Sequence, residues 1–120
     1  MMSPYVAPGI DLVNFDSIVD FMCDQCDVNK RLVLGDGRKR PEVFARQLSI
    51  YVLRRKTKKS YTEICAMFNR SNHTTGMHSY NTICGYIDVK DEQTIYILTE
   101  AAKRFGFIFK GKATERPRSL

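Results

Sequence analysis

Apolar side chains recur at intervals of three and four residues along most of the chain, which is the spacing of α-helices that bury one face. The first such pattern predicts a helix over residues 15–26, with acidic side chains on its outer face and Asn14 as its cap. Residues 1–10 hold two prolines and a glycine and are expected to form a loose arm. The apolar stripe of this helix consists of Phe15, Ile18, Val19 and Met22.

The middle of the chain predicts a long helix over residues 41–56. Asn29 is placed to start a short helical turn before it, and the Gly-Asp-Gly sequence at residues 35–37 ends that turn. Pro41 suits the first position of the long helix, because the amide hydrogen that it lacks would have no partner there. The core stripe of the long helix consists of Phe44, Leu48, Tyr51 and Val52.

Capping patterns predict the helices that follow. Ser60 and Glu63 form a capping box, in which each side chain accepts a hydrogen bond from a free backbone amide, and they predict a helix of about two turns. Asn72 is placed to cap a helix that runs to about residue 87. A last helix is expected over residues 91–105. Its inward side chains are expected to be Ile95, Leu98, Ala102 and Phe105.

These elements predict an all-α fold, a helix-turn-helix bundle of about five helices with a flexible N-terminal arm and a flexible C-terminal tail. With 120 residues, 43% of them hydrophobic, the chain is long enough for one core and too short for two ordinary domains. We expect the arm over residues 1–12, the domain over residues 13–108 and a basic tail over residues 109–120. The aromatic run FGFIFK at residues 105–110 either covers the core or joins a partner.

Charge is segregated along the chain. Residues 1–29 carry five Asp and no Lys or Arg, whereas residues 30–59 carry eleven Lys and Arg against two acidic side chains. Such a basic concentration is typical of a surface that binds a polyanion, although a solvated surface has the same composition. No apolar run approaches the roughly 18 residues needed to cross a bilayer, and the N-terminus lacks the pattern of a signal peptide. We therefore expect a cytoplasmic, nucleoid-associated protein without membrane contact.

The break at residues 69–72, between a short helix and a longer one, is the layout of a helix-turn-helix, whose second helix enters the major groove of DNA. Uncharged polar side chains suit this role, because base edges are read by short donors and acceptors. Gly76 costs the helix about 1 kcal/mol relative to alanine; it either permits close approach to DNA or only weakens the helix. The first turn holds His73, Thr74 and Thr75, and Thr75, His78, Ser79 and Thr82 form a polar stripe.

The segment RPEVFARQLSIYVLRRKTKKSYTEICAMFNRSNHTTGMHSYNTI resembles domain IV, the C-terminal DNA-binding domain of the bacterial replication initiator DnaA, a Trp-repressor-like helix-turn-helix. The His-Thr-Thr-x-x-His sequence with the upstream Arg-Gln pair is the specific part of this resemblance, which runs from about Phe15 to Phe105. The resemblance implies specific binding to a short duplex site of the DnaA-box type. Asn72 replaces the usual Asp, and Gly76 and Ser79 replace apolar or small residues, so the preferred site can differ from the familiar one.

The resemblance also implies a role for individual residues. Arg38 would enter the minor groove from the basic loop, where Lys39 lies beside it, and Arg46 and Gln47 would reach across the site from the long helix. Asn72 would cap the reading helix. His73, Thr74 and Thr75 would contact bases or the adjoining backbone, with His78 and Ser79 close to the DNA. Arg54, Thr57, Ser60 and Tyr61 would lie against phosphates.

The function expected from these observations is sequence-specific binding of double-stranded DNA by a stand-alone regulator of replication or transcription. The sequence has no G-x-x-x-x-G-K-[ST] phosphate loop, so no ATPase activity is expected. We expect neither a catalytic site nor a cofactor nor a small-molecule substrate, and replication or transcription proteins are candidate partners. The alternative is a protein-interaction module with the same fold, which would bind a partner instead of DNA, for example a basic partner through the acidic first helix.

Other chemistries find less support in the sequence. Cys23 and Cys26 together with His73 and His78 supply four nominal zinc ligands, but 46 residues separate the two pairs, which far exceeds the usual interval. Two residues five positions apart on a helix also point about 140° apart. No Ser, His and Asp are ordered by the sequence into a catalytic group. RNA binding is disfavoured because no sheet with stacking aromatic side chains is evident.

Overall fold

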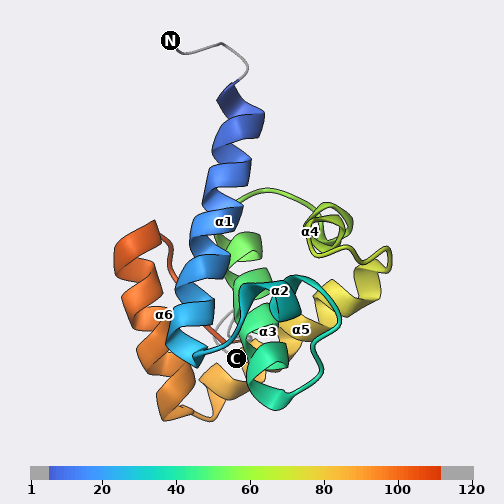
Figure 1. Ribbon diagram of the computed structural model, residues 1–120. Coiled ribbons are helices and arrows are strands. Elements are labelled where there is room, and N and C mark those ends of the chain that lie inside the picture. The colour runs from blue at the N-terminus through green and yellow to red at the C-terminus, as the bar shows by residue number, and fades with distance from the viewer. Residues whose placement is uncertain (1–5, 112–120) are drawn as a thin grey trace.

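The computed structural model describes residues 6–111, and the side chains of residues 14–111 (Figure 1). These residues form helices and no strand, which confirms the predicted all-α fold. The predicted arm and tail fall partly on residues 1–5 and 112–120, which lie outside the described residues. The helices are α1 (Val6–Cys26), α2 (Lys30–Leu34), α3 (Arg40–Lys56), α4 (Tyr61–Met67), α5 (His73–Asp88) and α6 (Glu92–Phe105).

The first helix starts earlier than the sequence pattern predicted. It begins at Val6 instead of Phe15, so residues 6–12 are helical and are not part of a loose arm. Asn14 therefore lies inside the helix and does not cap it. Pro8 is compatible with this start because it falls in the first turn, where an amide hydrogen would have no partner within the helix.

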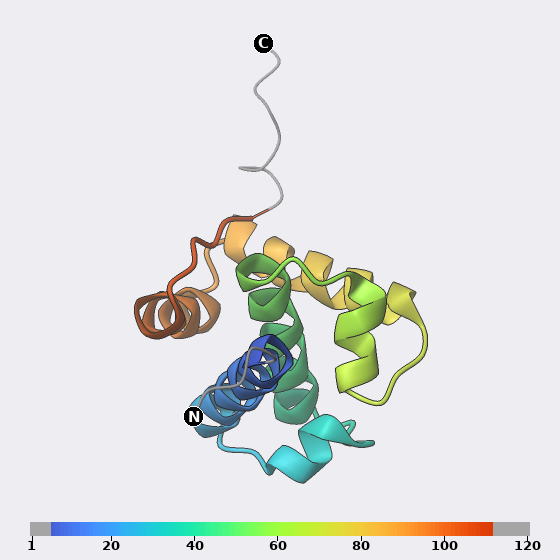
Figure 2. The same ribbon diagram turned by 90° about the horizontal axis from the view of Figure 1, so that it is seen from above.

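The core forms where α3 packs between α1 and α5 (Figure 2). The predicted stripe of α1 is buried, as are Leu48, Tyr51 and Val52 of α3, whereas Phe44 is only half-buried. The ring of Phe44 lies edge-on to that of Tyr86 of α5, with 6.0 Å between the ring centroids. At the start of α2 the Asn29 side chain accepts a hydrogen bond from the Arg31 amide, which confirms the predicted short turn.

The last helix turns a different set of side chains inward than expected. Asp91 caps α6 by accepting a hydrogen bond from the Thr94 amide at 3.0 Å. The apolar side chains of this helix form a broad face, and the packing against α1 and α5 selects the buried part of it. Ile95, Ala102 and Phe105 are only half-buried. The buried residues of α6 are Thr94, Ile97, Leu98 and Ala101.

Residues 106–111 form a segment that is attached to α3, so residues 109–111 do not belong to a free tail. The Tyr51 hydroxyl donates a hydrogen bond to the Lys110 carbonyl at 2.8 Å and accepts one from the Lys110 amide at 3.0 Å. Arg55 donates to the Ile108 carbonyl at 2.9 Å. Because Phe107 and Phe109 pack against the core, this aromatic segment covers part of it.

Candidate nucleic-acid interface

The helix-turn-helix consists of α4, the turn at residues 68–72, and α5 (Figure 1). The predicted capping box is present, since the Ser60 hydroxyl accepts from the Glu63 amide at 3.1 Å and Glu63 accepts from the Ser60 amide at 2.8 Å. The backbone of Asn69 has a φ of 60°, which lets the chain turn sharply after α4. Asn72 caps α5 as predicted, because its side-chain oxygen accepts a hydrogen bond from the Thr74 amide at 2.9 Å.

Gly76 is located where α5 packs on α4, so its close approach is to the protein and not to DNA. A Cβ atom at this position would lie 2.8 Å from Cys65 Sγ and 3.2 Å from Tyr61 Cδ1. Burial raises the pKa of the Cys65 thiol, while a hydrogen bond with the Gly76 backbone opposes the increase. Glycine thus sets the distance between the two helices.

The first turn of α5 presents uncharged polar side chains to the surface. His73, Thr74 and His78 are exposed, and Thr75 is half-buried. Ser79 is only 5% exposed, so the prediction that it belongs to the accessible stripe is wrong. It lies instead in the cleft between α3 and α5, which Val43 also lines. The accessible part of the predicted stripe is therefore His78 together with the half-buried Thr75 and Thr82.

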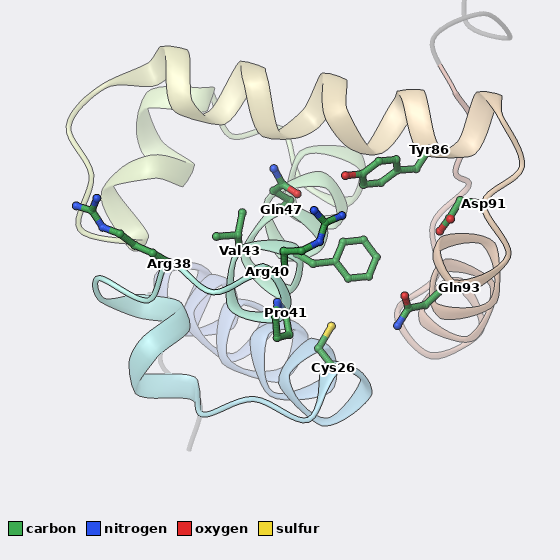
Figure 3. A pocket seen from close by; sticks show the side chains of 10 residues that line it. Cys26, Arg38, Arg40, Pro41, Val43, Gln47, Tyr86, Asp91 and Gln93 are labelled. Carbon is green, nitrogen blue, oxygen red and sulfur yellow. The ribbon is translucent and has the colours of Figure 1, made fainter.

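The basic loop before α3 exposes Arg38 and Lys39, and the first residue of the helix, Arg40, is exposed beside them. Glu42 holds this loop at its end by accepting a hydrogen bond from the Lys39 amide at 3.1 Å. The side chain of Arg38 points away from α3, whereas that of Arg40 extends between Gln47 and Tyr86 (Figure 3). The sequence pattern did not assign a role to Arg40, although its place in a run of three cations was a usable signal.

Two depressions lie along α3 and share Val43 and Gln47. The first lies between the starts of α3 and α6 and the end of α5, and it is the groove of Figure 3. The second lies between α3 and the start of α5. Gln47, which is half-buried, is thus positioned between the basic loop and the first turn of α5. The first depression is lined by Arg38, Arg40, Phe44, Tyr86, Asp91 and Gln93, and the second by Arg70, Asn72, Thr74, Thr75 and His78.

Arg46 lines the second depression beside Gln47, but its guanidinium is turned toward backbone carbonyls of the protein and not across the site, contrary to the prediction. It is 7% exposed, and its guanidinium donates hydrogen bonds to the carbonyls of Val33 at 2.7 Å and of Leu32 and Gly37 at 2.9 Å each. Burial lowers the pKa of Arg46, and the nearby positive charge of Arg70 adds to the effect. Arg46 thus binds the end of α2 and the start of the basic loop to α3.

The predicted phosphate contacts lie at the end of α3, in the segment that joins it to α4, and at the first residue of α4. The Arg54 guanidinium stacks over the Tyr61 ring at 4.2 Å and donates to the Lys59 carbonyl at 2.9 Å. The Thr57 hydroxyl donates to the Leu53 carbonyl at 2.7 Å, and Ser60 caps α4. Lys58 and Ser60 are exposed. These side chains are ordered by the protein itself, and their contact with phosphate stays a prediction.

The cysteines and histidines weighed as zinc ligands are distributed over α1 and α5. Cys23 and Cys26 are on α1, where burial raises the pKa of the Cys26 thiol to about 11. His73 and His78 are exposed on α5. Among residues 6–111, no three His, Cys, Asp or Glu side chains are grouped so as to hold a metal ion. In the same part of the chain, no helix has the length and apolar character needed to span a bilayer.

Comparison with known proteins agrees with this geometry. Residues 15–83 match the family described as bacterial DnaA protein helix-turn-helix. The chromosomal replication initiator protein DnaA of Herpetosiphon aurantiacus is 37% identical over 71 residues, which is 59% of this chain and 15% of that protein. The proteins of the same name from a Synechococcus species and from Bacteroides fragilis are 31% and 29% identical over 56% and 64% of this chain.

The similarity to these relatives is confined to a small part of each of them. The matched segments cover 15%, 14% and 16% of the three relatives, so the chain spans far less than their full length. No solved structure matches the chain. The family model covers more than half of the chain and includes α4, the turn that follows it and α5 as far as residue 83. The chain therefore belongs to the bacterial DnaA helix-turn-helix family, whose fold is that of a DNA-binding domain.

Proposed function

We propose that this chain binds a specific double-stranded DNA site of the DnaA-box type and acts as a stand-alone regulator of replication or transcription, without ATPase activity. One observation carries the proposal. The exposed, uncharged first turn of α5 and the exposed cations of residues 38–40 border two depressions that share Val43 and Gln47. Short polar groups suit base edges, and cations suit the flanking phosphates.

The proposed contact set follows from the accessibility of each side chain. His73, Thr74 and Thr75 are assigned to the major groove, with His78 beside them, and Arg38 to the adjacent minor groove. Lys39, Arg40 and Gln47 complete the contacts from the start of α3. Arg54, Thr57, Ser60 and Tyr61 are assigned to the phosphate backbone, together with the exposed Lys58. Arg46 and Ser79 are left out of the set because they are buried.

The regulatory part of the proposal rests on the sequence. The 120 residues contain no phosphate loop of the type that binds ATP, which is the basis for proposing binding without ATP hydrolysis. In this proposal the protein works in the cytoplasm at the nucleoid, together with replication or transcription proteins. It would act by occupying its DNA site. Replication and transcription are two outcomes of the same binding event, and locating the bound sites on a genome would distinguish them.

The test is selection of bound duplexes from a random pool at physiological salt, followed by titration of the selected duplex and a scrambled one. Thr75→Ala is expected to weaken binding to the selected duplex by about 1–3 kcal/mol and to bring the two duplexes closer in affinity. Lys58→Ala is the matched control, which is expected to weaken both duplexes equally, because a phosphate contact carries no sequence information. A pool without enrichment would refute the proposal.

A protein-interaction module is the second candidate function. It is favoured by α1, which exposes Asp16, Asp20 and Asp24 along its outer face, and by Asp27, which is exposed directly after this helix. Lys30 already bridges Asp16 and Asp20, at 3.3 and 2.9 Å, which reduces the negative charge available to a partner. The two functions differ in salt dependence on DNA. If the chain binds DNA, each neutralised phosphate contributes about −0.9 to the slope of log affinity against log salt concentration. If it is an interaction module, DNA affinity should depend little on salt and not at all on the DNA sequence.

A further inference from the structure

Arg70 connects the turn of the helix-turn-helix to the basic loop. Its guanidinium donates one hydrogen bond to the Phe68 carbonyl at 2.8 Å, within its own turn, and another to the Gly35 carbonyl at 2.9 Å. Gly35 ends α2 and is followed immediately by the loop that carries Arg38. One planar side chain thus spans two segments that are 35 residues apart in sequence.

The Gly35 carbonyl is an acceptor for two arginines. Arg46 also donates to it, at 3.4 Å, in addition to its shorter bonds to neighbouring carbonyls. Arg46 comes from α3 and Arg70 from the turn before α5, so the loop is held from two directions. Their positive charges repel each other, yet both stay beside the same oxygen. Both hydrogen bonds are kept in spite of this repulsion, and we infer that they define the position of the loop.

The short helix α2, which leads into the basic loop, does not pack closely on α4 or α5. Within the described residues, α2 packs mainly against α1 and α3, whereas α4 and α5 pack against each other and α3. The basic loop and the first turn of α5 are therefore two separate parts, and α3 and the Arg70 bond to Gly35 connect them. Both parts must meet neighbouring grooves of one duplex, so their spacing has to match the DNA.

We propose that Arg70 is a positioning residue for DNA recognition, which sets the spacing between the basic loop and the first turn of α5 before the DNA binds. The inference rests on the function proposed above. Preorganisation lowers the cost of ordering the loop on binding, which is about 0.5–1.5 kcal/mol for each immobilised side chain. Loss of the Arg70 bridge should therefore weaken specific binding by about 3- to 10-fold, since 1.4 kcal/mol is tenfold.

Titrations of the selected duplex with four variants test this role. Arg70→Met removes the charge and the bridge, and Arg70→Lys keeps the charge but loses the planar fork that binds two carbonyls. Both are expected to weaken binding by the same factor and to leave the salt slope unchanged. In the background of Arg38→Ala, Arg70→Met is expected to have a smaller further effect than in the wild type, because the loop has then lost one of the side chains that it positions.

Three results would overturn the proposal. Wild-type affinity in Arg70→Lys would show that only the charge matters. A salt slope reduced by about 1 in Arg70→Met would identify a direct phosphate contact. Multiplicative losses in the double variant Arg38→Ala, Arg70→Met would show that the two residues act independently.

Amide hydrogen exchange without DNA separates this inference from the proposed function. The Gly37 amide in the loop donates to the Leu32 carbonyl of α2 at 2.9 Å, so its exchange reports on the order of the loop. Arg70→Met is expected to speed exchange at Gly37 and to leave the buried middle of α3 protected, which also shows that the variant is folded. Unchanged exchange at Gly37 overturns the inference. A random pool that yields no preferred duplex, with faster exchange at Gly37, overturns the proposed function and leaves the Arg70 bridge confirmed as a structural tie.

Discussion

Replacing Gly76 with alanine tests the packing of α5 on α4. Inside a helix this change gains about 1 kcal/mol from helix propensity. The new methyl group would, however, lie 2.8 Å from Cys65 Sγ and 3.2 Å from Tyr61 Cδ1. Cys65 is fully buried, so its sulfur has no solvent to move into. Overpacking costs about 1–3 kcal/mol, and the net loss in the free energy of unfolding should therefore be up to about 2 kcal/mol.

The effect of Gly76→Ala on the free energy of unfolding should change sign when the sulfur of Cys65 is removed. In the background of Cys65→Ala, the methyl group at position 76 enters the space that Sγ has left, and only the edge of the Tyr61 ring has to shift. Gly76→Ala should then be neutral or stabilising by up to about 1 kcal/mol. The coupling between the two positions, which is the difference between the two backgrounds, should be about 1–3 kcal/mol.

Urea denaturation of the wild type, the two single variants and the double variant, followed by helical circular dichroism, measures this cycle. An equal effect of Gly76→Ala in both backgrounds would refute the packing argument. A second outcome would also contradict the packing argument. If Gly76→Ala keeps full stability but loses DNA affinity, then the glycine serves approach to DNA, and the α4–α5 contact is not the reason for it.

Three further predictions concern stability. Arg46→Met should lower the free energy of unfolding by about 2 kcal/mol or more in urea denaturation, because buried carbonyls lose a charged donor. Gln47→Ala, at the neighbouring position, should leave the free energy of unfolding unchanged and weaken DNA binding. Tyr51→Phe should cost about 1–3 kcal/mol and speed amide exchange at Lys110, whose amide and carbonyl both lose a partner. Hydrogen bonds from Thr94 at the start of α6 lower the pKa of Asp91. The ionised Asp91 therefore contributes to the stability of the fold above its unfolded pKa, and this contribution is lost as the pH falls through its folded pKa. Acid titration of Asp91→Asn should lack this part of the stability loss.

The boundaries of the helix-turn-helix could be predicted from the sequence, because they depend on contacts within a few residues. Ser60 with Glu63 and Asn72 with its own first turn form the predicted caps. Such bonds join neighbours in the chain, so residue type and spacing are sufficient to identify them. The start of α1 was missed because the prolines in the first ten residues resemble a loop signal, although Pro8 is tolerated in a first turn.

The roles of individual polar side chains required the tertiary structure. Arg46 and Gln47 are adjacent in the sequence, yet one is buried under loop carbonyls and the other lines both depressions. Ser79 was assigned to the accessible stripe of α5, but it is buried in the cleft between α5 and α3. The helical period states which residues share a face. It does not state how much of that face a neighbouring helix covers.

The sequence by itself determined that the chain forms a helical bundle with a capped helix-turn-helix, a polar first turn in the second helix and a cationic segment before it. Those features depend on local hydrogen bonds and on the periodicity of apolar side chains. Only the tertiary structure decided that Gly76 faces α4, that residues 106–111 pack on α3, and that Arg70 reaches Gly35. These contacts join residues far apart in the chain, and their partners are defined only when the helices have packed together.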